Sequence, residues 1–289
     1  MTAKTILVTG CSAGGLGATM ALALARRAHH VFATARTVSK IPAELSALSN
    51  VTVLALDTTS AESVAAAAAA VEASGRGLDV LVNNAGVGYT IPVLDIDIDT
   101  ARHLFDVNVF GVVRTVQGFA ELLIRSKGRI VNMSTNGTVV NTPWMAAYTA
   151  SKTALTSFSE TMRLELEPFG VTVVAIMAGT VNTHFHDNEP RFELPAGSRY
   201  AAIQDIIAGW ASGQLKPPGI SAEEYVEAIV DDIVGSGRGG GGLVWNGPYS
   251  GTIRFMSQWV PQWCNDAILR RMNLGFKELG EHLSGAGQK

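Results

Sequence analysis

The sequence is poor in cysteine and in charge. Of its 289 residues only two are cysteines, Cys11 and Cys264, and 16% are charged, with a net charge of −3. Two cysteines so far apart do not indicate a disulfide framework or a thiolate metal site, and they fit a reducing compartment. Without a surplus of basic residues the chain lacks the field that attracts nucleic acid, so we expect no nucleic-acid partner.

Long apolar runs are also absent. No stretch reaches the roughly 20 uninterrupted apolar residues that span a bilayer, and residues 1–10 carry neither the basic region nor the apolar region of a signal peptide. We therefore expect a cytoplasmic protein without a transmembrane segment. Residues 259–274 combine tryptophans, aliphatic residues and two arginines. This composition admits a peripheral contact with an internal membrane or lipid surface, although packing on the domain is the preferred interpretation.

Short apolar runs alternate with helix-length segments over the first 180 residues. Strands are expected at 6–8, 31–33, 51–56, 80–82, 130–133 and 171–177, and helices at 16–27, 61–73, 101–126 and 150–167. Buried strands separated by helices predict an α/β fold, a Rossmann-type doubly wound parallel sheet. A further helix at 222–234 and a strand at 243–245 complete one domain over 1–249, with an excursion at about 184–220. Residues 250–289 form a C-terminal extension that packs on the domain or on a partner.

Glycines gather between the first strand and the first helix, in the stretch TGCSAGGLG at 9–17. Glycine lets the backbone turn sharply and approach a pyrophosphate, whose charge is favoured at a helix N-terminus. In this strand–turn–helix context the turn predicts a dinucleotide site. The candidate cofactor residues in it are Gly10, Ser12, Ala13, Gly15, Leu16 and Gly17.

The same stretch also matches the Gly-x-Ser-x-Gly elbow of hydrolases at residues 10–14. In that alternative Ser12 is the nucleophile of a serine-type lipid ester hydrolase. The elbow would lie unusually early in such a fold, and it would leave Gly15 and Gly17 without a purpose. The cofactor turn is therefore the preferred interpretation.

The segment after the second strand contains an arginine and no acid. An aspartate or glutamate there would bind the ribose hydroxyls of NAD, but the sequence reads Ala33, Thr34, Ala35, Arg36. The guanidinium of Arg36 instead suits a 2′-phosphate. NADP(H) is the predicted cofactor.

Tyr148 and Lys152 begin a helical segment at a spacing of four residues, which places the phenol and the ammonium group on one helix face. A phenol with a reference pKa of about 10 exchanges protons poorly at neutral pH. A nearby ammonium favours its ionised form, so the pair can deliver or remove a proton at a reacting oxygen.

Over residues 4–183 the sequence resembles the short-chain dehydrogenase/reductase family. The resemblance rests on the glycine turn, on Asp57, on NNAG at 83–86, on Asn108 and on the Tyr148/Lys152 pair. Within the family, the turn and the segments 32–36 and 250–274 resemble the fungal acyl-dihydroxyacetone-phosphate reductase-like group, which includes lipid enzymes and tailoring reductases of secondary metabolism.

The resemblance implies a role for each matching residue. Tyr148 would donate the proton, Lys152 would bind the nicotinamide ribose and lower the pKa of the tyrosine, and Asn108 would hold a water in the proton relay. Asp57 and Asn83 would line the adenine side, and Thr183 would touch the carboxamide. The remaining residues of the implied cofactor set are Thr58, Ala85, Gly86, Gly179 and Val181. Ala178 replaces the proline that the family usually has before that glycine.

The residue that orients the substrate is open between two hydroxyls. Thr135 lies thirteen residues before Tyr148, where the family carries a serine, and Ser134 lies one residue earlier. Successive strand residues point to opposite faces, so the two are not expected to share the task. Spacing favours Thr135 and chemistry favours Ser134; Thr135 is preferred.

Aromatic residues of the excursion and the tail predict a wide apolar pocket for a polyketide, steroid-like or lipid-derived carbonyl. We expect reduction of a bulky hydrophobic ketone or aldehyde, or the reverse oxidation. A non-catalytic NADP(H)-binding sensor is the remaining alternative. His184, His186 and the aspartates at 95, 97 and 99 lack the further ligands of a metal centre, so no metal is expected. The resemblance implies a homo-oligomer through helices 101–126 and 150–167.

Overall fold

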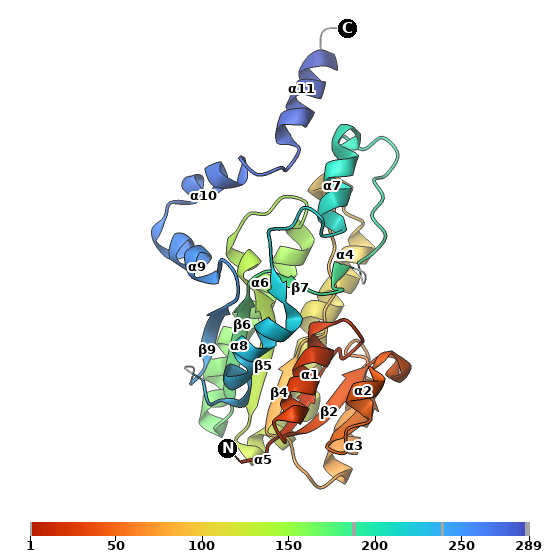
Figure 1. Ribbon diagram of the computed structural model, residues 1–289, viewed down its shortest axis with the longest axis vertical. Helices are drawn as coiled ribbons and strands as arrows, with labels where there is room; N and C mark the ends of the chain where they lie inside the picture. Colours follow the sequence, from red (N-terminus) through yellow and green to blue (C-terminus); the bar gives the residue numbers. More distant parts are fainter. Residues whose placement is uncertain (1, 187–188, 238–239, 287–289) are drawn as a thin grey trace.

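The computed structural model describes residues 2–186, 189–237 and 240–286, and a seven-stranded parallel sheet forms its centre (Figure 1). The strand order is β3-β2-β1-β4-β5-β6-β9, and every pair is parallel. The strands are β1 (Thr5–Val8), β2 (His30–Ala35), β3 (Val51–Ala55), β4 (Val80–Asn83), β5 (Arg129–Thr135), β6 (Thr172–Ala178) and β9 (Gly242–Asn246). The prediction of a Rossmann-type doubly wound sheet is confirmed.

Helices cover both faces of the sheet. Ile6 and Val8 of β1 pack into the core under α1 (Leu16–Arg26) and α8 (Ala222–Val234). Leu7 points to the opposite face, because successive strand residues alternate. There it joins the core formed with α3 (Ala61–Ala73), α5 (Gly111–Ser126) and α6 (Ala146–Leu166). A sheet buried on both faces explains why its strands are apolar without alternation.

The strand order reverses between β1 and β4. The chain proceeds outward from β1 through β2 to β3, then returns to the other side of β1 and proceeds from β4 to β6. The loops after β1 and β4 therefore separate at the carboxyl edge of the sheet and leave a crevice, where ligands bind in folds of this kind.

One long helical stretch runs through α4 (Ile98–Phe105), the π-helix η3 (Asp106–Phe110) and α5. Its 29 residues reach the length and hydropathy of a membrane span. Half of its most apolar window is buried inside the fold, which is the pattern of a helix that packs on a core.

The excursion and the tail contain more regular structure than the sequence predicts. A two-stranded sheet joins β7 (Val181–Asn182) to β8 (Ile220–Ser221), and α7 (Gln204–Ala211) lies between them in the chain. The C-terminal extension contains α9 (Ser250–Trp259), α10 (Gln262–Leu269) and α11 (Phe276–Ala286), which form an arm beyond the carboxyl edge of the sheet (Figure 1).

A separate apolar cluster attaches this arm to the rest of the chain. Trp144, which precedes α6, packs with Ile203, Ile207 and Trp210 of the excursion and with Leu274 of the arm. On the arm, the side chains of Trp259 and Trp263 are 74% and 72% exposed. The domain boundary at residue 249 and the peripheral membrane contact stay predictions.

Candidate active site

A cavity of about 1310 Å³ opens at the carboxyl edge of the sheet. Most of the candidate residues line it: Gly10, Ser12, Ala13, Gly15, Leu16, Arg36, Asp57, Thr58, Ala85, Gly86, Ser134, Thr135, Tyr148, Lys152, Gly179, Val181 and Thr183. Three candidates, Gly17, Asn83 and Asn108, do not line it. Residues from both halves of the sheet therefore meet in one cavity.

The glycine turn is held open by backbone contacts. Gly10 and Gly14 adopt left-handed conformations with φ of +75° and +72°, which glycine adopts without steric cost. The N–H of Cys11 donates to the carbonyl of Thr34 at 2.8 Å, and that of Ala13 to the carbonyl of Lys40 at 2.9 Å. Cys11 is fully buried in the core, and this burial raises the pKa of its thiol to about 12.

The N-terminus of α1 suits an anion. Gly15 provides no side-chain cap, and the first turn contains no acidic residue. The first N–H groups of a helix have no partner within the helix, so here they are left for a ligand in the cavity. Gly17 allows the close packing of α1, because a Cβ there would lie 2.4 Å from the carbonyl oxygen of Gly10. These features fit the pyrophosphate of a dinucleotide.

The adenosine end of the cavity is cationic. Arg36 and Lys40 line it and are exposed. Asp57 follows β3, and although partial burial opposes its ionisation, hydrogen bonds from Thr59 and the charge of Arg36 lower the pKa of its carboxyl. The residues therefore fit a dinucleotide with an additional phosphate on the adenosine ribose.

The hydrolase alternative lacks its strained nucleophile. An elbow places its serine in a strained turn conformation. Among the described non-glycine residues, positive φ angles occur at Ala28, Lys127, Trp144 and Tyr249 and not at Ser12. The left-handed positions of the turn are the glycines on either side of Ser12, as expected for a turn that approaches a cofactor.

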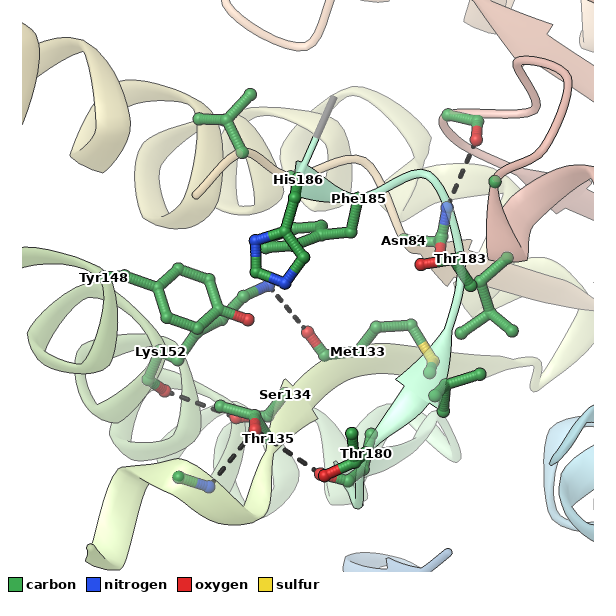
Figure 2. A pocket seen from close by; sticks show the side chains of 18 of the residues that line it. Asn84, Met133, Ser134, Thr135, Tyr148, Lys152, Thr180, Thr183, Phe185 and His186 are labelled. Atoms are coloured by element: carbon green, nitrogen blue, oxygen red, sulfur yellow. Dashed lines mark hydrogen bonds between the residues drawn. The ribbon is translucent and has the colours of Figure 1, made fainter. Parts of the chain in front are cut away.

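Tyr148 and Lys152 project from the first turns of α6 toward the end of β5 (Figure 2). The Nζ atom of Lys152 donates to the carbonyl oxygen of Met133 at 2.9 Å, and burial lowers the pKa of this ammonium to about 8. Burial, together with the carboxylate of Glu189, raises the pKa of the Tyr148 phenol. The expected lowering by Lys152 is not found, because burial and the charge of Glu189 both act to raise the pKa of this phenol.

Asn108 lies in the π-helix between α4 and α5, which the sequence did not predict. Its Nδ2 donates to the carbonyl of Val87 at 2.9 Å and to Ser151 Oγ at 3.0 Å, and its Oδ1 accepts from the N–H of Val87 at 2.9 Å. The side chain thus ties the loop after β4 to α6. π-Helical turns often occur at functional sites, but the water-holding role of Asn108 stays a prediction.

The two neighbouring hydroxyls at the end of β5 differ in surroundings. Ser134 is 5% exposed, and its Oγ is 2.8 Å from Thr156 Oγ1 on α6. Thr135 is half-buried, accepts a hydrogen bond from the N–H of Gly137 at 3.1 Å and donates to the carbonyl of Ala178 at 3.4 Å. Both line the cavity, but the hydroxyl of Ser134 is hydrogen-bonded to Thr156 of α6.

Asn83 does not line the cavity, whereas the next residue, Asn84, does. The Nδ2 of Asn83 donates to Asn132 at 2.9 Å, and Asn132 donates to Ser159 at 2.8 Å, all within the core. Asn84 lines the cavity and donates to the carbonyl of Thr9 at 2.9 Å. The expected contact of the Asn83 side chain with the adenine side is therefore not found, because strand alternation turns that side chain toward β5 and α6.

Part of the cavity lining comes from the excursion and the arm. Trp210 and Ile253 line the cavity, as do Met256, Ile268, Leu269, Met272 and Leu274. The sequence predicts aromatic residues here but not these aliphatic ones. No local pattern marks them, since they reach the site only through the fold of the arm.

Comparisons with known proteins agree with this geometry. A family model described as short chain dehydrogenase matches residues 4–193. The chain is 38% identical over 273 residues to the short-chain dehydrogenase ptmH of Penicillium ochrochloron, covering 94% of this chain and 98% of that one. It is 36% identical to the NADPH-dependent 1-acyldihydroxyacetone phosphate reductase of Schizosaccharomyces pombe, covering 81% and 80%. A short chain dehydrogenase from Burkholderia cenocepacia in complex with NADP superposes with a TM-score of 0.73 at 26% identity, covering 92% and 97%.

Proposed function

Because the chain belongs to the short-chain dehydrogenase family, we propose that it is an NADPH-dependent oxidoreductase that reduces a bulky hydrophobic ketone or aldehyde to an alcohol, or catalyses the reverse oxidation. One observation carries the proposal. The phenol of Tyr148 and the ammonium of Lys152 share a cavity with the uncapped glycine turn, so a proton donor and a dinucleotide site face the same space.

The chain's own residues would hold NADP(H) along this cavity. The glycine turn and the N-terminus of α1 would bind the pyrophosphate, Arg36 the 2′-phosphate, and Thr183 with Lys152 the nicotinamide end. The NADP bound to the Burkholderia relative and the NADPH dependence of the fission yeast reductase support this choice. When bound, NADPH supplies a hydride to the carbonyl carbon.

Tyr148 would supply the proton to the carbonyl oxygen. A phenol is protonated at neutral pH even at its ordinary pKa of about 10, as a donor in the direction of reduction must be. Thr135 lines the same cavity, and its hydroxyl accepts a hydrogen bond from Gly137 instead of bonding to α6. It would therefore hold the carbonyl oxygen beside Tyr148. These are the roles that we assign to the pair and to Thr135.

The substrate would be large and apolar. Trp210, Ile253 and Met256 line the same cavity, and apolar side chains there favour an apolar ligand. Several relatives are fungal short-chain dehydrogenases, such as those from Penicillium ochrochloron and Penicillium crustosum. A polyketide, steroid-like or lipid-derived carbonyl fits this wall.

The test is NADPH oxidation by the purified protein against a panel of hydrophobic ketones, with Tyr148→Phe as the matched variant. We expect Tyr148→Phe to lower kcat/KM by at least about a hundredfold, since it removes the proton donor, and to keep the affinity for NADPH. A variant that keeps full reductase activity would contradict the assignment. A protein that binds NADPH but reduces no ketone would be the sensor instead.

The cofactor preference has its own test. Replacing Arg36 with alanine removes the guanidinium that we assign to the 2′-phosphate, so the Kd for NADPH should rise about tenfold or more while that for NADH stays the same. Fluorescence titration with both nucleotides measures the two constants. An equal change for both nucleotides would assign Arg36 to another part of the site.

We also propose a homo-oligomer. Phe110 and Phe158 lie within the two helical segments expected to form the interface, and they are 52% and 42% exposed. Apolar side chains exposed in this way fit a subunit contact. Sedimentation velocity would show a species larger than the monomer.

A cytoplasmic location stays a prediction.

A further inference from the structure

The segment after β7 places two titratable side chains beside the catalytic pair, and neither has a role in the proposed reaction. The imidazole of His186 lines the cavity. Its Nδ1 is 2.8 Å from Oε1 of Glu189, whose side chain is only 4% exposed. A carboxylate is costly to bury unless it is paired, so this arrangement needs a reason.

Ring contacts connect His186 to Tyr148. The centroids of Phe185 and Tyr148 are 5.5 Å apart, and those of Phe185 and His186 are 5.6 Å apart. Figure 2 shows the rings of His186 and Phe185 on the same side of the site as the ring of Tyr148. The imidazole therefore belongs to the same wall as the phenol that donates the proton.

Two glycines leave the room that the pair occupies. A Cβ on Gly88 would lie 2.4 Å from Oε1 of Glu189, and a Cβ on Gly213 would lie 2.6 Å from Cδ2 of His186. Any other residue at these two positions would displace the carboxylate or the ring. The pair is thus seated between the loop after β4 and the turn after α7, and its position is fixed from both sides.

The hydrogen bond to Glu189 leaves one ring nitrogen for a ligand. In the neutral imidazole the proton that bonds Glu189 sits on Nδ1, so Nε2 is an acceptor; in the charged ring Nε2 is a donor whose charge Glu189 balances. Among the described residues Nε2 has no hydrogen-bond partner. A hydroxyl group serves as donor or acceptor, so it matches the ring in both states.

We propose that His186, oriented by Glu189, binds a hydroxyl group of the substrate near the carbonyl that Tyr148 protonates. The inference rests on the proposed function and narrows its substrate class to hydroxylated ketones, such as phenolic ketones. His186 is then a specificity-determining residue, and Glu189 is a positioning residue that acts through it.

The test compares binding of tetralone with that of its hydroxylated isomers, the hydroxyl being moved to each ring position in turn. Ligand affinity is measured in the NADP⁺ complex through tryptophan fluorescence, because Trp210 lines the cavity. In the wild type, at least one hydroxytetralone should bind about tenfold or more tightly than tetralone. His186→Phe keeps a ring against Phe185 but should abolish this preference, leaving the affinity for tetralone within about threefold.

Three further variants sharpen the result. His186→Gln should restore part of the preference, and Glu189→Gln should weaken it, since the ring then loses its charged partner. Glu193→Gln, an exposed carboxyl on the same segment, should behave as the wild type. The proposal is overturned if no isomer is preferred, or if His186→Phe keeps the preference. Failure of the protein to bind NADP⁺ would instead contradict the proposed function.

Discussion

Burial of the Lys152 ammonium in the site lowers the stability of the folded protein. Its side chain is 6% exposed, and burial lowers the pKa of its ammonium from the usual 10.5 to about 8. Between these two values the unfolded chain holds a proton that the folded chain has lost. The folded protein therefore gains stability as the pH rises from about 8 to 10.5, and below pH 8 the whole penalty remains.

Replacing Lys152 with methionine should remove that penalty. At pH 7 we expect the variant without cofactor to unfold at a higher urea concentration, with a gain of up to about 3 kcal/mol, reduced by the lost hydrogen bond to Met133. The gain should shrink as the pH is raised to 10, and reductase activity should be lost. Urea unfolding at pH 7 and 10 measures it. A variant less stable than the wild type at pH 7 would show that the hydrogen bond outweighs desolvation.

Single residues were predictable where spacing along one element decides their position. The interval between Tyr148 and Lys152 places both on one face of α6, and the cavity contains both. Asn83 was misplaced because the NNAG motif does not say which of two adjacent amides faces the crevice. The close packing of Glu189 against Gly88 could not be predicted either, since these residues are about a hundred positions apart in the sequence.

The glycine turn depends on how closely α1 approaches the sheet. A Cβ on Gly17 would lie 2.4 Å from the carbonyl oxygen of Gly10 and 2.5 Å from Nδ2 of Asn84. Because the first is a backbone atom and the second is an amide nitrogen hydrogen-bonded to Thr9, the helix itself would have to shift. Its N-terminal N–H groups would then move away from the position at which they can bind a pyrophosphate.

Gly17→Ala should therefore weaken NADPH binding by about tenfold or more and destabilise the fold by about 1–3 kcal/mol. Gly251→Ala is the matched control, because that glycine lies in α9 with nothing within 4 Å of an added Cβ. There alanine should be neutral or slightly stabilising, since it favours the helix. Equal effects of both substitutions, measured by nucleotide titration and thermal unfolding, would show that close packing at residue 17 does not matter.

Elements that follow a simple hydrophobic period were found from the sequence, and the others were not. The helices α3 and α8 begin and end where the sequence predicts, because an alanine-rich or amphipathic pattern marks each. The π-helix at Asp106–Phe110 leaves no such mark, since the same residues also suit a regular helix. The helices α7, α10 and α11 are short, and each contributes residues to the apolar cluster around Trp144. A local sequence pattern does not contain such contacts.

Binding of the cofactor and choice of the substrate are assigned to two different regions of the chain. The family model ends at residue 193, and every residue that we assign to the cofactor precedes it. The wall that faces the substrate comes largely from α9, α10 and the residues after them. Changes in this wall should therefore affect the choice of substrate without affecting the cofactor, provided that the cluster around Trp144 keeps the arm in place.

Met256→Trp tests this division. Met256 lines the cavity from α9, and a larger ring there should occupy space needed by a bulky substrate, which typically costs about 1–3 kcal/mol of transition-state binding. We expect kcat/KM for a bulky ketone to fall about tenfold or more. The value for a small ketone such as cyclohexanone should stay within about threefold, and the Kd for NADPH should not change.

The control is Phe255→Trp, the neighbouring position on the same helix. Phe255 is 60% exposed and does not line the cavity, so the same indole should leave both ketones and NADPH unaffected. If Met256→Trp instead lowered the values for large and small ketones alike, the arm would act on the catalytic residues and not on the shape of the pocket. If it changed neither, the substrate would bind without reaching α9, and the apolar wall of the arm would serve only to attach the extension.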